Sequence, residues 1–215
     1  MVEQKTRLSE IEHSVWTELV SKAIVRSISS LSQMVGQTIT VPTLDTRPID
    51  IKEVAYLFGG PEALIVGVYL RVSGSVEGQI MLVYSPQAAF ELLDLLMGEA
   101  PGTTQNLGEM EMSGLGEIGN TMGAHFLNYL ADSTGLSLNP SPPAVMMDMA
   151  GAILDAALAE IMRESDETWI VEATFGTEDY QHSGTFLVML TPELLRVLTE
   201  HWSHNNSEAL PGNAG

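Results

Sequence analysis

An internal repeat constrains the fold of this chain more than any other feature of its sequence. Glu18 and Gly36 recur 99 residues later as Glu117 and Gly135, and each pair brackets an apolar stretch with helical spacing. The segment 78–86 also recurs, 106 residues later. Because this period is too long for a solenoid, it predicts a duplicated half-domain, and the larger second offset predicts a few extra residues inside the second copy.

Both copies predict the same order of elements: a long helix, an extended proline-containing segment, a short amphipathic segment, a two-stranded hairpin, and a helix that begins with proline. Runs of β-branched and aromatic residues separated by glycine-bearing turns predict the hairpins. These runs are 63–72 with 79–84, and 168–175 with 185–190. Ser85-Pro86 and Thr191-Pro192 predict helix starts, because a hydroxyl caps free amides and proline at the first helical position loses no hydrogen bond.

The elements do not alternate as they do in a doubly wound sheet. We therefore expect an α+β fold, in which long helices pack on one face of an antiparallel sheet and a pseudo-two-fold axis relates the two half-domains. We expect a single domain over residues 1–204, with repeats at about 8–98 and 107–202. The polar segment 205–215 is expected to be a disordered tail.

Composition narrows the classes of partner. The 28 acidic residues against 9 basic ones give a net charge of −19, so nucleic acid and anionic membrane surfaces are poor partners. The chain has no cysteine, which excludes disulfides and thiolate chemistry. The first residues lack the apolar run of a signal peptide, and no apolar stretch reaches the roughly 18 to 20 residues of a membrane helix. We expect a cytoplasmic protein.

The most informative predicted helix covers residues 107–134. Its apolar residues have helical spacing and predict a core stripe, consisting of Leu115, Ile118, Met122, Phe126, Leu127 and Leu130. The 12 methionines of the chain lie largely on such stripes, and we expect them to fill the core. Ser113, Glu117 and Asn120 lie on a different face at i, i+4 and i+7, in one row on adjacent turns. This row is a candidate functional site, although an exposed Glu beside an Asn is also typical of an ordinary solvated face.

Glycines interrupt this helix at Gly116, Gly119 and Gly123, and each costs up to about 1 kcal/mol relative to alanine. We expect them to give a bare, flat surface that another backbone or a partner protein can approach closely. The alternative is tight helix-on-helix packing.

The second copy contains the pattern Ser113-x3-Glu117-x2-Asn120-x22-Pro143. This resembles the signature of the CheC, CheX and FliY chemotaxis phosphatases. The segments 116–123 (GEIGNTMG) and 142–155 (PPAVMMDMAGAILD) resemble the CheC branch most closely. The resemblance extends over roughly residues 8–202.

The resemblance implies a phosphatase that hydrolyses the aspartyl phosphate of a CheY-like response-regulator receiver domain. It implies that Glu117 and Asn120 are the catalytic residues, with Asn120 orienting the attacking water and Glu117 docking the partner. Ser113 and Pro143 are accessory positions of the same motif. Mg²⁺ would be held by the receiver's own acidic residues, so no cofactor or metal ligand is expected in this chain.

The first copy departs from the pattern. The 99-residue offset places Ser14, Glu18 and Ser21 at the positions of Ser113, Glu117 and Asn120. A serine side chain is too short to reach as an asparagine does, so we expect this first site to be degenerate.

Two other functions remain open. The chain could be a non-enzymatic adaptor that binds a receiver or the deamidase CheD, and the lost first site favours this reading. A flagellar-switch component of the FliY kind is the third alternative, which is weakened because no switch-binding domain follows residue 202.

Overall fold

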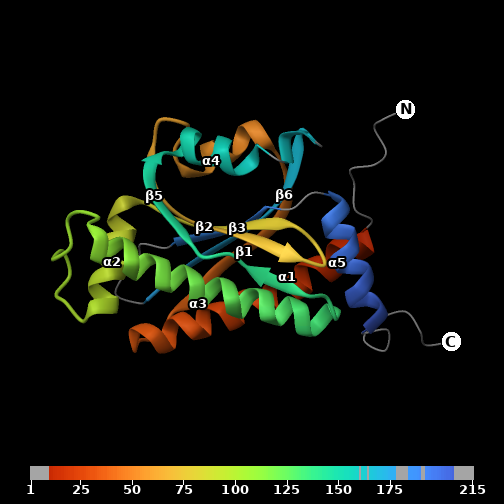
Figure 1. The fold of residues 1–215 in the computed structure, drawn as a ribbon, viewed down its shortest axis with the longest axis horizontal. Coiled ribbons are helices and arrows are strands. Elements are labelled where there is room, and N and C mark those ends of the chain that lie inside the picture. The colour runs from red at the N-terminus through yellow and green to blue at the C-terminus, as the bar shows by residue number, and fades with distance from the viewer. Residues whose placement is uncertain (1–9, 160, 164, 178–183, 190–191, 206–215) are drawn as a thin grey trace.

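The computed structural model describes residues 10–159, 161–163, 165–177, 184–189 and 192–205, and its elements follow the predicted order (Figure 1). The first copy comprises α1 (Glu10–Val35), β1 (Thr40–Asp50), the 3-10 helix η1 (Ile51–Phe58), β2 (Leu64–Gly74), β3 (Gly78–Tyr84) and α2 (Pro86–Met97). The second comprises α3 (Glu109–Thr134), β4 (Leu138–Pro140), β5 (Ala144–Met149), α4 (Ala150–Leu158), the 3-10 helix η2 (Ile161–Arg163), β6 (Glu167–Gly176), β7 (Gly184–Met189) and α5 (Pro192–Asn205). Apart from Asn205, the predicted tail lies outside the described residues.

The two copies share one antiparallel sheet. Its strand order is β1-β6-β7-β3-β2-β4, and β5 also pairs with β2. β1 of the first copy pairs with β6 of the second, and β4 and β5 of the second copy pair with β2 of the first. The order is therefore symmetric about the junction of β7 with β3, as the predicted pseudo-two-fold axis requires. The α+β fold class predicted from the sequence is confirmed.

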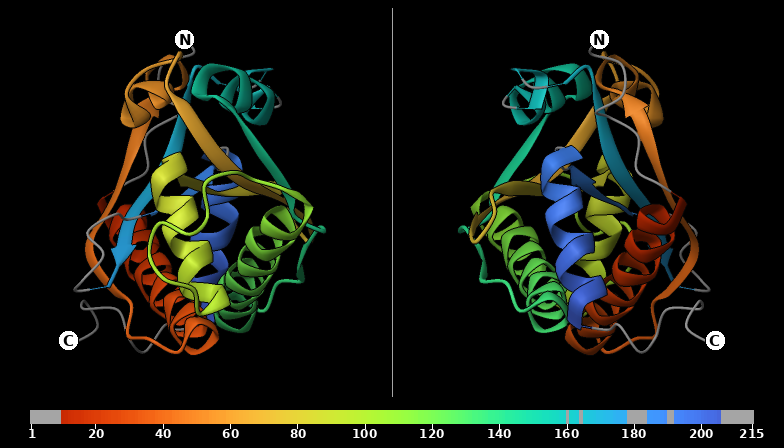
Figure 2. Two further views of the ribbon diagram at one scale, coloured as in Figure 1. Left: turned by 90° about the vertical axis from the view of Figure 1, so that its left-hand side faces the viewer. Right: turned by 90° about the vertical axis from the view of Figure 1, so that its right-hand side faces the viewer.

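The sheet has a hydrophobic core on each face. Trp16, Phe126 and Phe186 belong to the larger core, where the four long helices α1, α2, α3 and α5 cover one face. Ile51, Ile153 and Met81 belong to the second core, where η1 and α4 cover the opposite face. Figure 2 shows these two layers from either end of the molecule. The long helices pack on one face as predicted, and the short layer on the other face is an addition to that prediction. Among the described residues, no helix is both long enough and apolar enough to cross a membrane.

The repeated glycines that helped to fix the register are helix caps. Gly36 and Gly135 directly follow α1 and α3 with φ of 68° and 74°, a left-handed conformation that glycine adopts without a steric penalty. The hydroxyl of Ser85 accepts a hydrogen bond of 3.1 Å from the amide of Ala88 and caps α2, as predicted. The equivalent Thr191 lies outside the described residues.

Candidate functional site

An open groove of about 830 Å³ follows the first half of α3. One wall is α3 itself, and the other is the segment that leads from β4 into β5. The lining residues are Glu109, Met112, Ser113, Gly116, Glu117 and Asn120 on α3, and Pro140, Ser141, Pro142, Pro143 and Val145 on the opposite wall. All four positions of the sequence pattern, Ser113, Glu117, Asn120 and Pro143, therefore lie at one groove, although Pro143 is distant from the others in the chain.

The polar row of α3 faces outward. Ser113, Glu117 and Asn120 are exposed, while Leu115 and Ile118 between them are completely buried and fix the orientation of the helix. Within the described part of the chain, neither the carboxylate of Glu117 nor the carboxamide of Asn120 has a hydrogen-bond or ion-pair partner. Both groups are thus available to a molecule that enters the groove.

Of the four glycines of α3, Gly119 and Gly123 do not present the partner-facing surface that we expected. Gly116, Gly119 and Gly123 are buried. A Cβ atom at Gly119 would overlap Cγ1 of Val68, and one at Gly123 would lie 2.9 Å from Cδ2 of Leu70. Both neighbours belong to β2, so the alternative of close packing within the chain is correct, although against the sheet rather than a helix. This close approach sets the depth at which the polar row lies above the sheet.

Gly116 has a different environment, because it borders the groove. A Cβ atom there would lie 3.6 Å from Cγ of Pro143 and 3.8 Å from Cγ2 of Val145, which are ordinary van der Waals distances. The absence of a side chain at Gly116 therefore widens the floor of the groove without being required by the packing of α3 on β2.

A β-bulge brings Pro143 to the groove. Val72 of β2 pairs with Pro140 of β4, and Tyr69 of β2 pairs with Ala144 of β5. Between these two pairs, β2 advances by three residues and the segment from β4 to β5 advances by four, so that segment carries one extra residue. The interruption covers residues 141–143, and its two prolines have no amide hydrogen to donate to the sheet. Bulges re-aim the side chains of a strand, and here the segment forms the second wall of the groove.

A buried carboxylate holds the loop that leads into α3. Asp94 in α2 is 1% exposed and accepts hydrogen bonds from the amides of Gly102 (2.7 Å), Thr103 (3.1 Å) and Thr104 (2.8 Å). Burial alone would raise the pKa of Asp94, but the hydrogen bonds from Thr104, Gly102 and Thr103 together outweigh it and hold the pKa below its ordinary value. The ionised carboxylate therefore anchors the approach to the helix that carries the polar row.

The equivalent residues of the first copy are engaged within their own helix. Ser14 and Glu18 are exposed and Ser21 is half-buried. The hydroxyl of Ser21 donates to the carbonyl oxygen of Thr17 at 2.6 Å, and Oε1 of Glu18 pairs with Nζ of Lys22 at 2.6 Å. This hydrogen bond to Glu18 raises the pKa of Lys22. Neither group is presented as freely as Glu117 and Asn120 are.

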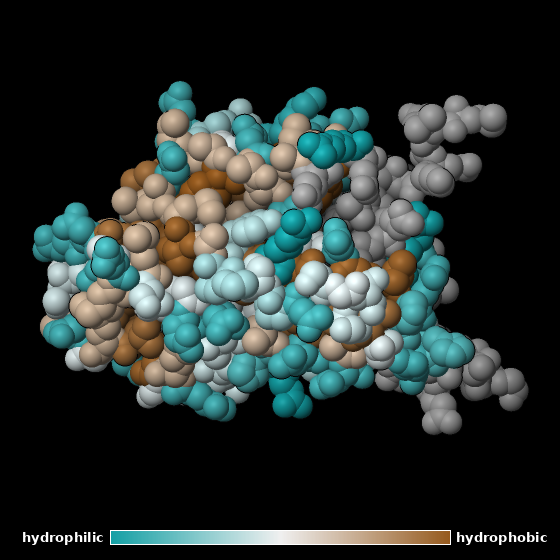
Figure 3. Space-filling view, viewed as in Figure 1, coloured by the Kyte–Doolittle hydropathy of each residue, from teal (hydrophilic) through white to brown (hydrophobic). Residues whose placement is uncertain are grey.

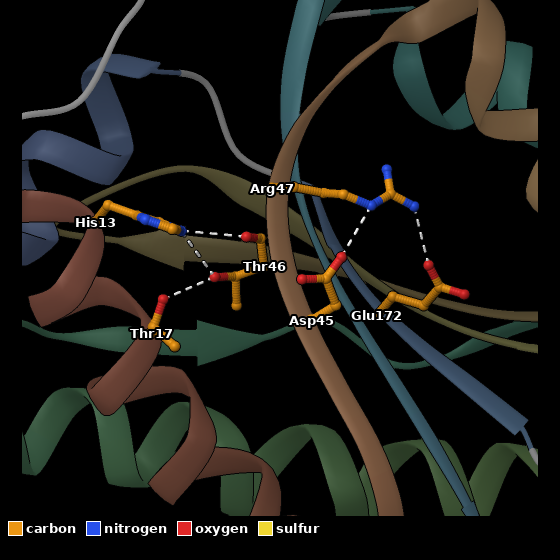
Figure 4. A network of polar contacts seen from close by, with 6 residues as sticks. All are labelled: His13, Thr17, Asp45, Thr46, Arg47 and Glu172. Atoms are coloured by element: carbon orange, nitrogen blue, oxygen red, sulfur yellow. Dashed lines mark hydrogen bonds and ion pairs between the residues drawn. The ribbon is translucent and has the colours of Figure 1, made fainter. Parts of the chain in front are cut away.

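A polar network occupies the place of the groove in the first copy (Figure 4). Thr17 and Thr46 stand 99 residues before Gly116 and Val145, and their hydroxyl oxygens are hydrogen-bonded at 2.7 Å. His13 donates from Nε2 to the carbonyl oxygen of Thr46 at 3.2 Å, and its ring packs 5.2 Å from the ring of Trp169. α1 and β1 are therefore joined where α3 and β5 leave an open groove.

Reasoning from the sequence missed Thr17 and Thr46, which join α1 to β1 in the first copy, and it missed the role of Gly116 in widening the groove of the second copy. Aligning the two copies at the 99-residue offset would have identified the substitution of Thr17 by Gly116 and of Thr46 by Val145. The hydrogen bond between the two threonines depends on tertiary structure, and no local pattern signals it.

The groove offers hydrogen-bonding and acidic groups rather than a metal centre. Glu109 and Glu117 supply its ionisable side chains, and no lysine or arginine of the described part of the chain lines it. In the described ranges, no group of three or more His, Asp or Glu side chains could hold a metal ion. A carboxamide can both accept and donate hydrogen bonds, so Asn120 can orient a water molecule and contact an anion at the same time.

Comparison with known proteins agrees with this geometry. Residues 110–147, which contain the polar row and the bulge, match the model of the CheC-like family. The chain is 24% identical over 188 residues to the CheY-P phosphatase CheC of Bacillus subtilis, which covers 86% of this chain and 90% of that protein.

Solved structures share the fold. FliY of Thermotoga maritima superimposes with a TM-score of 0.75 at 23% identity, covering 96% of this chain and 100% of that one. A structure of the FliM–SpeE complex from H. pylori has a TM-score of 0.64 at 14% identity, covering 95% of this chain and all of the matched one. The match to the CheC-like family model over residues 110–147, the CheC relative and the shared fold together support a place for this chain in the CheC/CheX/FliY family of chemotaxis proteins.

Proposed function

We propose that this protein hydrolyses the aspartyl phosphate of a CheY-like receiver domain in chemotaxis signalling, with Asn120 as its catalytic residue. The observation that carries the proposal is the exposed Asn120 carboxamide, which has no partner among the described residues and lies on an open groove beside Glu117. The similarity to a CheY-P phosphatase over most of both chains supports the same activity.

The reaction requires a water molecule to attack phosphorus in line with the aspartyl oxygen. The new P–O bond forms as the bond between phosphorus and the aspartyl oxygen breaks, and the products are inorganic phosphate and a free carboxylate. The carboxamide oxygen of Asn120 accepts a hydrogen bond from the water, while its N–H donates toward a phosphoryl oxygen. Asn120 thereby places the nucleophile, and positioning of this kind is a main source of catalysis in phosphoryl transfer.

Glu117 serves a different purpose. A carboxylate next to a phosphoryl group would repel it, so the favourable role is an ion pair with a cation of the receiver beside its phosphorylation pocket. Mg²⁺ bound to the receiver's own acidic residues would supply the positive charge on the phosphoryl oxygens. Ser113 and Pro143 shape the two walls of the groove that receives the partner.

The test is the decay of a receiver phosphorylated with acetyl phosphate and freed of excess donor, followed with wild type, Asn120→Ala, Glu117→Ala and Ser21→Ala. Asn120→Ala is expected to lower the turnover by about 100-fold, the scale for loss of one hydrogen-bonding group that acts in the transition state. Glu117→Ala is expected to weaken receiver binding. Ser21→Ala is the matched control on the first copy and keeps the wild-type rate.

An adaptor function is the alternative, and the likeness of the fold to a FliM complex is consistent with it, because a shared fold does not fix the activity. It predicts that all four proteins leave the spontaneous decay rate unchanged while the wild type still binds the receiver. That result would contradict the proposed activity.

A further inference from the structure

Several methionines do not fill the core as we expected. In the described residues, the exposed large apolar side chains include Met110, Met112, Met147, Met149 and Met162. Met147 and Met149 are 44% and 49% exposed, and Leu64 beside them is 50% exposed. Met112 lines the groove, and Met147, Met149 and Leu64 lie farther along β5 and β2. We call these four exposed apolar side chains the methionine stripe. Figure 3 shows hydrophobic surface gathered in the left half of the view, around β5 and the start of α3.

The stripe is continuous with the groove. Met112 and Val145 both line the groove. Successive side chains of a strand alternate between faces, so Val145, Met147 and Met149 point to the same side of β5. Met149 pairs with Leu64 across the ladder, which extends the apolar surface onto β2. One surface thus runs from the groove at Asn120 to the edge of the sheet.

The first copy lacks this surface, although it has the same backbone arrangement. At the 99-residue offset, Met147 and Met149 correspond to Pro48 and Asp50, and Met112 corresponds to His13. Asp50 pairs with Glu167 of β6 where Met149 pairs with Leu64 of β2. The exposed methionines therefore accompany the copy that has the asparagine, and His13, Pro48 and Asp50 stand in their places in the copy that has lost it.

We infer that the methionine stripe is the docking surface for the receiver domain whose aspartyl phosphate reaches Asn120. This inference rests on the proposed function and adds the specificity-determining contacts. Unbranched, polarisable methionine side chains adapt to an apolar surface without a fixed shape, which suits a partner that must dock, react and leave.

Charge restricts the partner surface further. Glu109 and Glu117 line the groove, and among the residues that the structure describes no lysine or arginine does. The receiver surface that fits is apolar opposite the stripe and cationic at its margin, next to the phosphorylation pocket. A second copy of this acidic chain would place like charges against one another and is disfavoured.

The experiment uses the double variant Met147→Gln/Met149→Gln, which preserves side-chain length and removes the apolar character. Met162→Gln is the matched control, because Met162 is 51% exposed and lies in η2, away from the groove. Binding is measured with the receiver loaded with beryllofluoride, and turnover with the phosphorylated receiver over a range of concentrations. A urea melt checks that each variant keeps the wild-type stability.

The double variant is expected to raise both the Kd for the beryllofluoride-loaded receiver and KM by about tenfold, with kcat within twofold of wild type. Met162→Gln is expected to change none of these. Unchanged Kd and KM in the double variant, with an active wild type, would overturn the docking inference alone. If the wild type binds the receiver but shows no turnover, the phosphatase proposal is refuted. The docking inference is then decided by the Kd of the double variant compared with that of the wild type.

Discussion

Two identical substitutions three residues apart on α3 are expected to have opposite effects on stability. Gly116→Ala gains up to about 1 kcal/mol of helix propensity, and its Cβ atom meets Pro143 and Val145 only at ordinary contact distances. Gly119→Ala has the same intrinsic gain, but its Cβ atom would overlap Cγ1 of Val68, a stiff β-branched side chain that is completely buried. Overpacking of this kind costs about 1 to 3 kcal/mol, so after the gain in helix propensity Gly119→Ala should lose about 1 kcal/mol net.

Urea unfolding of both variants measures this difference directly. Val68→Ala in the Gly119→Ala background makes room for the new methyl group, so the double mutant should be more stable than the sum of the two single changes predicts. If Gly119→Ala is as stable as Gly116→Ala, the argument that the glycines exist to bring α3 onto β2 is refuted. Turnover by Gly116→Ala reports separately on whether the groove needs its open floor.

Three further changes test other parts of the structure. Asp94→Asn should lose about 2 kcal/mol of unfolding free energy at pH 7. Because the folded-state pKa of Asp94 is lowered, its stabilisation is complete above the ordinary aspartate pKa and is lost as pH falls from there through the lowered folded-state pKa. The stability deficit of the variant in urea melts should therefore shrink as pH falls below about 4, the ordinary aspartate pKa, and a deficit that stays constant with pH would contradict the carboxylate's role. Tyr84→Phe should raise the thermal midpoint or leave it unchanged, because the buried hydroxyl of Tyr84 has no hydrogen-bond partner in the described part of the chain. A fall of several degrees in the midpoint would show that the hydroxyl has a partner and would contradict this reasoning. Ser21→Asn alone should add no phosphatase activity to the Asn120→Ala background, because the hydrogen bond between Thr17 and Thr46 still closes the first groove, and a measurable gain would refute that closure.

The sequence was sufficient for features that depend on local chemistry or on the repeat. Gly36 and Gly135 mark helix ends because the left-handed conformation that follows a helix favours glycine in either copy. The core stripe of α3 follows from helical periodicity alone, and Leu115, Ile118 and Phe126 are buried as predicted.

Features that depend on what packs against an element could not be predicted in the same way. Helical spacing shows that Gly119 and Gly123 share a face, but it does not say that β2 covers that face. The exposed Met147 and Met149 have the composition of a core strand, and only the position of β5 at the margin of the sheet leaves them uncovered. The alignment of Pro143 with Asn120 requires the register of β4 and β5 on β2.

The central claim is that the Asn120 carboxamide enters the phosphoryl pocket of a receiver. The most direct measurement is the NMR resonance of the Asn120 side-chain amide, assigned by its loss in Asn120→Ala, during titration with the beryllofluoride-loaded receiver. The account predicts a large shift of this resonance that saturates with binding and is absent with the unloaded receiver. A receiver that binds at saturation and leaves the Asn120 amide unshifted would contradict it.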